Sequence, residues 1–594
     1  MANENSQFPI PRRNLDKRIK GIAKGQKPSC KIIIHRWSAP TLVGLEALNI
    51  KSGDFFNNNK KQDLTRQALN NMFIDNDIVR CNIHKNKNSS SGGFSLVLKR
   101  GNAGDDGSPV NSNPIDYLKL INPGDWISIF MRKDDDIKFT NAADSGLKMI
   151  GIIENVRLVE IDDPESGRPR LEYVVSGRDF GKIFENEIHY NPVIANDTGL
   201  QEILGISLLQ QSSAQTGNKQ KKALSPDQIV KSMVDFYLGG EGNTVASTNK
   251  VWFVPSTVSK LVGGGNSKSF IKILDTSRVG LQKYSNGKFS SAKPLLGKTF
   301  PLSLPFTGTV WGAMKQYSNP ILNEMIVDLT NKNGKLVPSF QIRQIPYSNK
   351  SNSAPYAYNR SPGSGLDALT ANGDKTFMLD LPKHEIESTD VKQKNVGKSD
   401  FERVNAIIVT PNVSFGTQGN NIYQAYTMVL NAPSIQRHGL RIIKGNSIYT
   451  FDTTLTFEKY VAKATSLMTD WFMTAHLLYN GTIITDGTNE FVEVGQNLFI
   501  KDVKQLFHIE GISYMYEINP QDGNTIYNTE FRVSRGQLTD SNALKSDFIG
   551  VPVELQDDQG VTIITNALEN IRNTEKRNSK GGTKGGGGFG GFNL

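Results

Sequence analysis

Two segments of this 594-residue chain repeat the same order of β-strand signals, and this internal repeat limits the possible folds more than any other feature. The first segment spans residues 122–180 and the second spans residues 492–537. Each contains a strand, a longer strand, a polar hairpin turn and a closing strand that ends in Ser-Gly-Arg or Ser-Arg-Gly. The repeat predicts that a small β domain has been duplicated. The alternative, that any two β hairpins look alike at this level, stays open.

Glycines recur at matching places in the two segments. Gly124 and Gly495 stand at the turn into the first strand, and Gly151 and Gly511 stand early in the long strand. Glycine weakens a strand locally, so its recurrence indicates a bulge or the sharp bend that a small barrel needs. The first copy is longer because it carries extra residues in a hairpin loop, including the acidic run Asp134, Asp135 and Asp136.

The remaining patterns predict more strands and three helices. Strand-like runs occur at 31–39, 94–101, 125–131, 149–161, 170–180, 325–330, 338–348 and 401–415. A helix is expected over about 226–238, because Ser225 can serve as N-cap, Pro226 suits the first helical position and Gln228 suits a capping box. A short helix at 308–320 and a long helix at about 456–479, with one broad apolar stripe, complete the set.

Composition excludes several classes of protein. The cysteines are only Cys30 and Cys81, too few for a disulfide framework or a four-cysteine zinc site. Neither a signal peptide nor a membrane-spanning run is expected, which predicts a protein made in a cytosol. The net charge of +10 is a weak indication of nucleic-acid binding, because most positive charge is balanced. Basic residues concentrate in an arm that is expected to be solvated or docked on a partner, with phosphate binding as the alternative: Arg12, Arg13, Lys17, Arg18, Lys20, Lys24 and Lys27.

No pattern predicts a catalytic, cofactor or metal site. The seven histidines show no zinc-binding spacing, so structural or surface roles are expected for His35, His84, His189, His384, His438, His476 and His508. The run Asp134–Asp136 lacks the alternating ligands of a calcium loop and is expected at a solvated hairpin tip. The acidic pairs Asp162 with Asp163 and Glu385 with Glu387 could in principle serve a glycosidase, but such pairs are common in chains of this length.

The order of these motifs resembles the baseplate hub proteins of contractile phage tails, whose fold is shared with the base of type VI secretion spike proteins. The motifs are GDWISIF, GIIENVRLVE and VVSGRDFGKIFE in the first copy, PSFQIRQIPY in the middle, and VNAIIV with EGISYMYEINPQDG in the second copy, within roughly residues 30–540. The resemblance implies a mainly β (α+β) fold with two duplicated tube-like β-barrel domains plus intervening α+β and loop-rich regions. It also implies a non-enzymatic virion protein of the tail baseplate, assembled in the host cytoplasm.

The same resemblance implies partners and a domain plan. Three chains would join a sixfold tail tube to a threefold central spike, so the expected partners are a homotrimer, the tail tube protein, the spike protein and other baseplate proteins, with the tape measure protein as a further candidate. DNA would only pass through a channel. The expected domains are a basic arm (1–30), a first barrel (31–200), a middle α+β region with a loop-rich insertion near 240–300 (201–400), a second barrel (401–545) and a C-terminal extension (546–594).

Two other functions remain open. One is a different tail-tip or baseplate protein that binds a host receptor through the 240–300 segment, and the other is a tail enzyme that degrades cell-wall polymer. Phe589 and Phe592, within the glycine-rich C-terminal segment, are expected to contact a neighbouring chain.

Overall fold

The computed structural model describes residues 27–37, 71–75, 77–99, 116–162, 169–190, 226–238, 252–265, 269–280, 282–285, 288–291, 306–318, 320, 323–346, 381–411, 415–416, 422–423, 427–447, 469–473, 475–518, 524–538 and 561–565. These residues form a mainly β protein, which confirms the expected fold class in its coarser form. Most of the basic arm, the 165–168 turn, residues 456–468 and the glycine-rich C-terminal segment lie outside this part of the chain.

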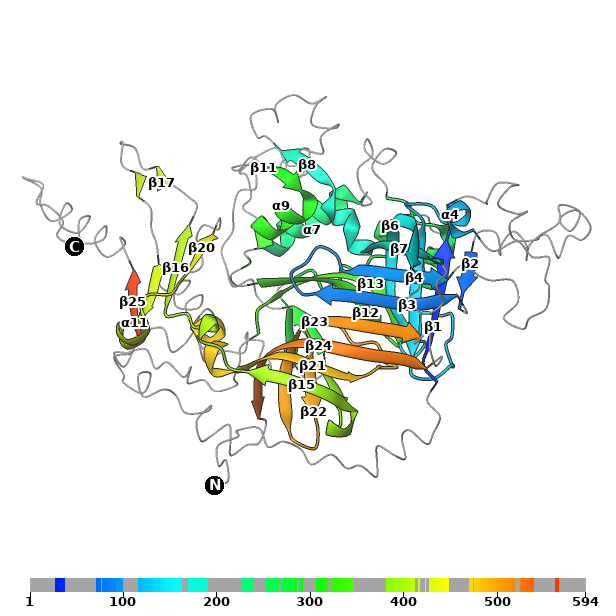
Figure 1. The fold of residues 1–594 in the computed structure, drawn as a ribbon. Coiled ribbons are helices and arrows are strands. Elements are labelled where there is room, and N and C mark those ends of the chain that lie inside the picture. Colours follow the sequence, from blue (N-terminus) through cyan, green and yellow to red (C-terminus); the bar gives the residue numbers. More distant parts are fainter. Residues whose placement is uncertain are drawn as a thin grey trace, which may run out of the picture.

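Most of the described strands belong to one large mixed sheet (Figure 1). Along it lie β15 (Val391–Gly397), β21 (Tyr479–Asp486), β24 (Thr525–Leu538), β23 (Gln505–Ile518), β3 (Ile78–Asn86), β4 (Gly93–Lys99), β7 (Pro169–Asp179), β6 (Leu147–Asp162), β5 (Trp126–Arg132), β1 (Ser29–His35) and β2 (Asn71–Ile74). Two more strands join beside β23, namely β22 (Asn497–Ile500) and β14 (Lys383–Ile386). In the described part of the chain this sheet stays open, with β15 and β2 at its ends.

The other strands form smaller sheets. A four-stranded sheet is set apart from the large one in Figure 1 and contains β20 (Ile442–Ser447), β16 (Ala406–Pro411), β19 (Thr427–Asn431) and β25 (Val561–Thr565). The two-stranded pairs are β8 (Glu187–Tyr190) with β11 (Phe306–Thr309), β9 (Gln282–Ser285) with β10 (Lys288–Ser291), β12 (Asn323–Lys332) with β13 (Lys335–Gln344), and β17 (Phe415–Gly416) with β18 (Ile422–Tyr423).

In the described part of the chain the helices are few and short. They are α4 (Tyr117–Leu120), α7 (Pro226–Tyr237), α8 (Ser256–Leu261), α9 (Val310–Ser318) and α11 (Ala432–His438). The helices predicted at 226–238 and 308–320 are therefore confirmed. The end predicted for the long helix is wrong, because residues 469–473 form one π-helical turn, Ala475–Leu477 form a 3₁₀ turn, and Tyr479 already begins β21. The β-branched residues of β21 pair with β24, and this pairing ends the helical conformation before Tyr479 although the apolar spacing continues to that residue.

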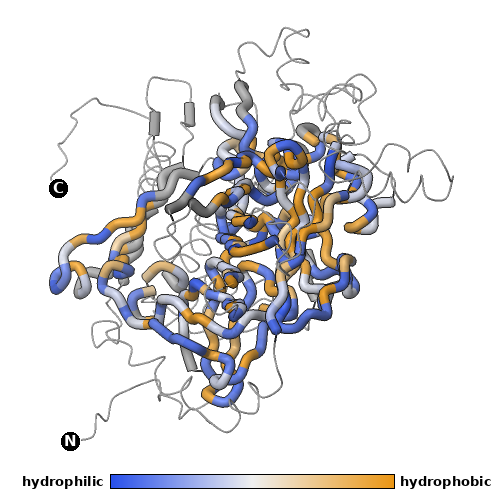
Figure 2. Tube along the Cα trace, turned by 45° about the vertical axis from the view of Figure 1, so that its right-hand side comes forward, coloured by the Kyte–Doolittle hydropathy of each residue, from blue (hydrophilic) through white to orange (hydrophobic). Residues whose placement is uncertain are grey.

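Two hydrophobic cores lie on the two faces of β5. One face, with Ile127 and Ile129, packs into a core that both repeats share. The other face, with Trp126 and Phe130, packs against α7, α8, α9, β12 and β13. Both faces of β5 are therefore buried, and Figure 2 shows hydrophobic stretches along many of the described strands. Val258 and Phe270, from the segment expected to be a loop-rich insertion, are fully buried in the second core.

The two repeats have the same strand order. In the first, the strands lie side by side as β3, β4, β7, β6, β5 and β1, and in the second they lie as β15, β21, β24, β23, β22 and β14. Corresponding strands also follow the same order along the chain. One strand pairing differs in direction between the repeats, because β1 runs antiparallel to β5 whereas β14 runs parallel to β22.

Hydrogen bonds align the repeats residue by residue. The amide of Gly124 donates to the carbonyl of Ile153 (2.8 Å), and the amide of Gly495 donates to the carbonyl of Ile509 (3.0 Å). The two glycines have φ angles of 91° and 82°, a backbone conformation that favours glycine. The predicted equivalence of Gly124 and Gly495 is therefore confirmed.

The predicted equivalence of Gly151 and Gly511 is wrong by four residues. In each long hairpin a bulge falls at a glutamate, Glu154 in the first repeat and Glu510 in the second. Aligning these bulges matches Gly151 with Phe507. At each position a neighbouring strand comes too close for a side chain. A Cβ on Gly151 would lie 2.6 Å from the carbonyl oxygen of Arg178, and a Cβ on Gly511 would lie 2.3 Å from Asn86 Oδ1.

Candidate functional site

The strongest candidate site is the seam where the two repeats join within the large sheet. There β23 of the second repeat pairs antiparallel with β3 of the first, from Gly511 opposite Asn86 to Glu517 opposite Arg80. Tyr514 lies opposite Ile83, and both side chains are completely buried. On the solvent side Arg80 forms an ion pair with Glu517. The seam makes one continuous sheet from two similar units.

A buried ionic cluster closes one end of this seam. The ammonium of Lys87 lies 2.8 Å from a carboxylate oxygen of Glu510 and 3.0 Å from one of Glu324. Arg343 also bonds Glu324, and it donates to the carbonyl of Gly495. The side chains of Lys87, Glu324 and Arg343 are at most 5% exposed. The cluster joins the first repeat, the β12–β13 hairpin and the second repeat.

A second buried ion pair lies beside the first. Lys85 Nζ is 2.6 Å from Asp328 Oδ1, with side chains 4% and 2% exposed. Asp328 also accepts hydrogen bonds from the backbone amides of Leu329 (2.8 Å) and Val494 (3.3 Å). Charged groups removed from water need such compensation, since each unpaired buried charge costs several kcal/mol. The β3 strand is therefore bound to its surroundings through Lys85, and through Lys87 just after its end, as well as through its backbone.

His508 belongs to the cluster as a neutral base. Its Nε2 lies 3.2 Å from the ammonium of Lys87, which can only donate, so Nε2 accepts and Nδ1–H faces Asn497 Oδ1 at 3.3 Å. Burial, and then the positive charge of Lys87, lower the pKa of His508 from its usual 6.5 to about 3. Burial raises the pKa of Glu510, but the positive charge of Lys87 and the hydrogen bonds from Lys87 and Ser534 oppose it, and this pKa lies well below its usual value.

This environment predicts a pH dependence that a His508→Gln substitution should remove. The unfolded chain protonates His508 below pH 6.5, whereas the folded protein does so only near pH 3, so stability from this group is complete above pH 6.5 and is lost as the pH falls. Between pH 6 and 4 we expect the wild type to lose about 1.4 kcal/mol per pH unit relative to the variant. Urea denaturation at several pH values measures this difference. Parallel pH curves for the two proteins would contradict the assignment.

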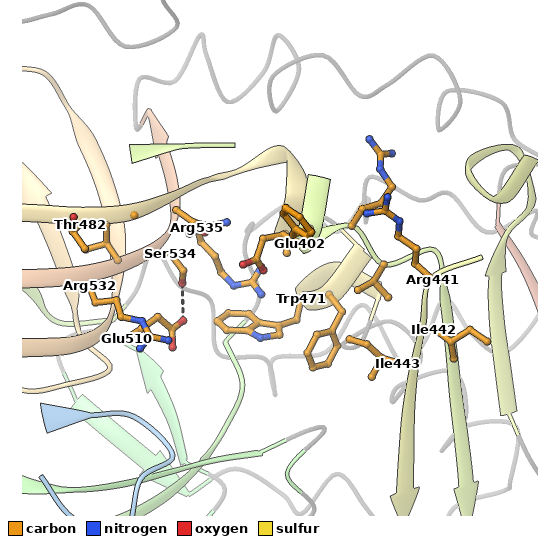
Figure 3. A pocket seen from close by; sticks show the side chains of 18 residues that line it. Glu402, Arg441, Ile442, Ile443, Trp471, Thr482, Glu510, Arg532, Ser534 and Arg535 are labelled. Atoms are coloured by element: carbon orange, nitrogen blue, oxygen red, sulfur yellow. Dashed lines mark hydrogen bonds between the residues drawn. The ribbon is translucent and has the colours of Figure 1, made fainter. Parts of the chain in front are cut away.

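A cavity lies on the other side of Glu510, between the large sheet and the four-stranded sheet (Figure 3). Its volume is about 960 Å³. Arg535 stacks on Trp471, with the guanidinium carbon 3.4 Å from the ring centroid, and Ser534 donates a hydrogen bond to Glu510 (2.6 Å). Phe401, at the cavity, is 98% exposed. The described lining contains the carboxylates Glu402 and Glu510 but neither histidine nor cysteine.

The acidic run Asp134–Asp136 forms contacts to protein groups. Asp134 bonds Arg132 (2.6 Å) and accepts a hydrogen bond from Asn489 of the second repeat (3.2 Å), and Asp135 pairs with Lys31 (3.0 Å). The loop inserted in the first repeat therefore docks on the second repeat. Across the described residues, no group of three or more histidine, cysteine, aspartate or glutamate side chains is placed to hold a metal ion.

The other acidic residues considered from the sequence are not brought together as a catalytic pair. Glu385 pairs with Lys501 (2.8 Å), and Glu387 takes part in a capping box at a 3₁₀ turn. Asp162 ends β6, and Asp163 lies outside the described residues.

The histidines are spread over the fold. His35 is buried beside Ser128 (2.9 Å) and Thr257 (3.0 Å), and burial lowers its pKa to about 4. His84 contacts Ser513 at the surface of the seam (3.1 Å). The remaining described members are His384 in β14, His438 at the end of α11, and the buried His476, while the side chain of His189 is not described.

Comparison with known proteins gives structural neighbours only. No family model and no curated protein matches the sequence. A tail protein from Neisseria meningitidis MC58 is 12% identical over 78% of this chain and 93% of its own, with a TM-score of 0.36. A 43 kDa tail protein of prophage MuSo2 from Shewanella oneidensis is 11% identical over 77% and 94%, with a TM-score of 0.34. A chain of the Francisella PdpA-VgrG complex is 11% identical over 86% and 58%, with a TM-score of 0.33.

The structural neighbours of this chain are therefore phage tail and VgrG-related proteins. At these identities and scores the likeness identifies no function, so we infer function from the repeats and from the contacts between them. Among the helices described here, none is both long and apolar enough to cross a membrane.

Sequence reasoning missed the ionic cluster. Its members come from positions 87, 324, 343, 508 and 510, and separation of this kind leaves no local pattern. The single available signal was a pair of lysines at alternate positions, Lys85 in β3 and Lys87 directly after it, following the apolar inward residues of that strand. Charged residues on the buried face of a strand need partners.

Proposed function

We propose that this chain is a structural virion protein, the central hub in the baseplate of a contractile phage-type tail. Three copies would form a ring of six similar units that joins a sixfold tail tube to a threefold central spike. The observation that carries the proposal is the repeat itself: two units with the same strand order lie in one continuous sheet within each chain. Threefold symmetry then presents six similar surfaces, and a closed ring avoids open filaments.

The proposal includes the partners of the hub. The ring would bind the tube protein on one side and the spike on the other, with other baseplate proteins and the tape measure protein around it, and DNA would pass through its channel during ejection. Assembly would take place in the host cytoplasm.

A structural role is favoured over an enzymatic one by the cavity chemistry. A glycosidase needs a carboxylic acid whose pKa is raised so that it can donate a proton. Glu510 is instead ion-paired with Lys87, and its pKa is lowered. A receptor-binding insertion near 240–300 is disfavoured because Val258 and Phe270 pack into the second core.

The oligomeric state tests the proposal. We expect the purified full-length chain to form trimers, with a mass of three chains by light scattering after size-exclusion chromatography. A chain that remains monomeric up to its solubility limit, or one that assembles into dimers or hexamers, would contradict the hub.

A further inference from the structure

The two repeats differ in how many neighbours their long strands have. The outer half of β23 lies between β24 and β3. The corresponding half of β6, residues 155–161, pairs with β7, and its other edge has no partner strand in the described part of the chain. One edge of the first repeat is therefore open where the second repeat has a paired edge.

A second open edge is complementary to the first. β15 ends the large sheet and pairs with β21 alone among the described strands, whereas its counterpart β3 lies between β4 and β23. Gly177 and Val533 are equivalent, because they lie opposite the matched residues Ile153 and Ile509. Two strands further along the sheet, the same pairing leads from Gly177 to Ile83 and from Val533 to Val396, so Ile83 and Val396 are also equivalent. An unpaired edge presents free amide and carbonyl groups and favours pairing with another chain.

Equivalent residues at these edges also differ in how deeply they are buried. Tyr514 in β23 is completely buried, but its counterpart Leu158 in β6 is 43% exposed. Ile83 in β3 is completely buried, but its counterpart Val396 is half-buried. Helix α4 covers the face of the sheet beside β7, where Tyr117 packs against Tyr173, and still leaves Leu158 accessible.

We propose that residues 155–161 of β6 in one copy pair antiparallel with residues 393–399, in and after β15, of a second copy of this chain. The register is taken from the internal seam, where Tyr514 faces Ile83, so Leu158 faces Val396. This inference rests on the proposed trimer and specifies its contact. Each ring would then contain three internal seams and three seams between chains, all with the same strand pairing.

The register is chemically favourable. It places Glu160 opposite Lys394 on the inward face, next to the apolar pair of Leu158 and Val396. Opposite charges and apolar groups facing one another across antiparallel strands stabilise the pair. Lys394, which already contacts Gln505 (3.0 Å), sits at the position that Cys81 holds in the internal seam. Opposite Arg157 the register places Gly397, so no like charges meet there.

Disulfide cross-linking tests the register. In the Leu158→Cys/Val396→Cys variant, the two new thiols from different chains should lie directly opposite, within the range that a disulfide can span. Mild oxidation should give covalent dimers and trimers on a non-reducing gel. The wild type is one control, because its native Cys30 and Cys81 are buried. The matched control is Arg157→Cys/Val396→Cys, since a shift of one residue places the side chain on the other face of the sheet.

Each outcome decides the inference. Cross-linking of the first variant alone supports it. A trimer by light scattering that shows no cross-link, or equal cross-linking in both variants, would overturn the register while leaving the proposed trimer standing. A chain that stays monomeric would contradict both.

Charge reversal gives a second test that needs no oxidation. Glu160→Lys should weaken trimer formation by about tenfold, because each ring contains three such contacts and like charges facing across strands repel. Adding Lys394→Glu should restore assembly. If Glu160→Lys leaves the trimer unchanged, or if the double variant does not recover, the proposed pairing is wrong.

Discussion

Replacing Lys87 with methionine should lower the free energy of unfolding by about 3–5 kcal/mol, the usual penalty for leaving a buried charge without its partner. Lys87 is 5% exposed and lies within 3.0 Å of carboxylate oxygens of both Glu324 and Glu510. Methionine keeps the length of the side chain but removes the ammonium, so the buried carboxylate of Glu324 and the partly buried carboxylate of Glu510 lose a counter-charge. The folded seam between the repeats loses this stabilisation, whereas the unfolded chain is unaffected.

Guanidinium denaturation followed by tryptophan fluorescence measures the effect. The matched control is Lys392→Met, because Lys392 pairs with Asp486 at 2.7 Å but both side chains are about one-third exposed. We expect that control to change stability by at most about 1 kcal/mol. Adding Glu510→Gln to Lys87→Met should recover part of the loss. Equal effects of the two lysine substitutions would show that the cluster contributes no more than a surface ion pair.

Gly177→Ala should strongly destabilise the first repeat. A Cβ at Gly177 would lie 2.1 Å from the carbonyl oxygen of Ile152 and 2.8 Å from the ring of Phe94. The obstacle is backbone as well as side chain, so β7 would have to move away from β6, and overpacking of this kind costs about 1–3 kcal/mol or more.

Gly93→Ala is the control for this substitution. Gly93 lies in β4 beside Gly177, but a Cβ there would meet its nearest atom at 3.8 Å. We expect a change of less than about 1 kcal/mol, measured as the shift in thermal unfolding midpoint of both variants. Comparable losses at the two positions would contradict the described packing of β6 and β7.

The sequence predicted what local patterns encode. The strands at 125–131, 149–161 and 170–180 correspond to β5, β6 and β7, because alternation and β-branched residues report directly on a strand. The Gly124 and Gly495 turns were also predictable, since a left-handed conformation favours glycine. These features need only neighbouring residues.

Long-range features could not be predicted in this way. The glycine pattern set the long strands four residues out of register, because Gly511 reflects the approach of β3 and not a repeat-wide bend. The pairing of β23 with β3 joins residues more than 400 positions apart. The ionic cluster depends on that pairing, so Lys85 and Lys87 could suggest that buried partners exist, but not which residues they are.

A reconstruction of the assembled particle tests the central claim most directly. Three chains should form a ring in which the two repeats superpose after a rotation of about 60°, as three duplicated chains require. In that ring β6 of one chain should lie beside β15 of the next, with Leu158 facing Val396. A ring of one or six chains, or repeats that do not superpose after that rotation, would contradict the account.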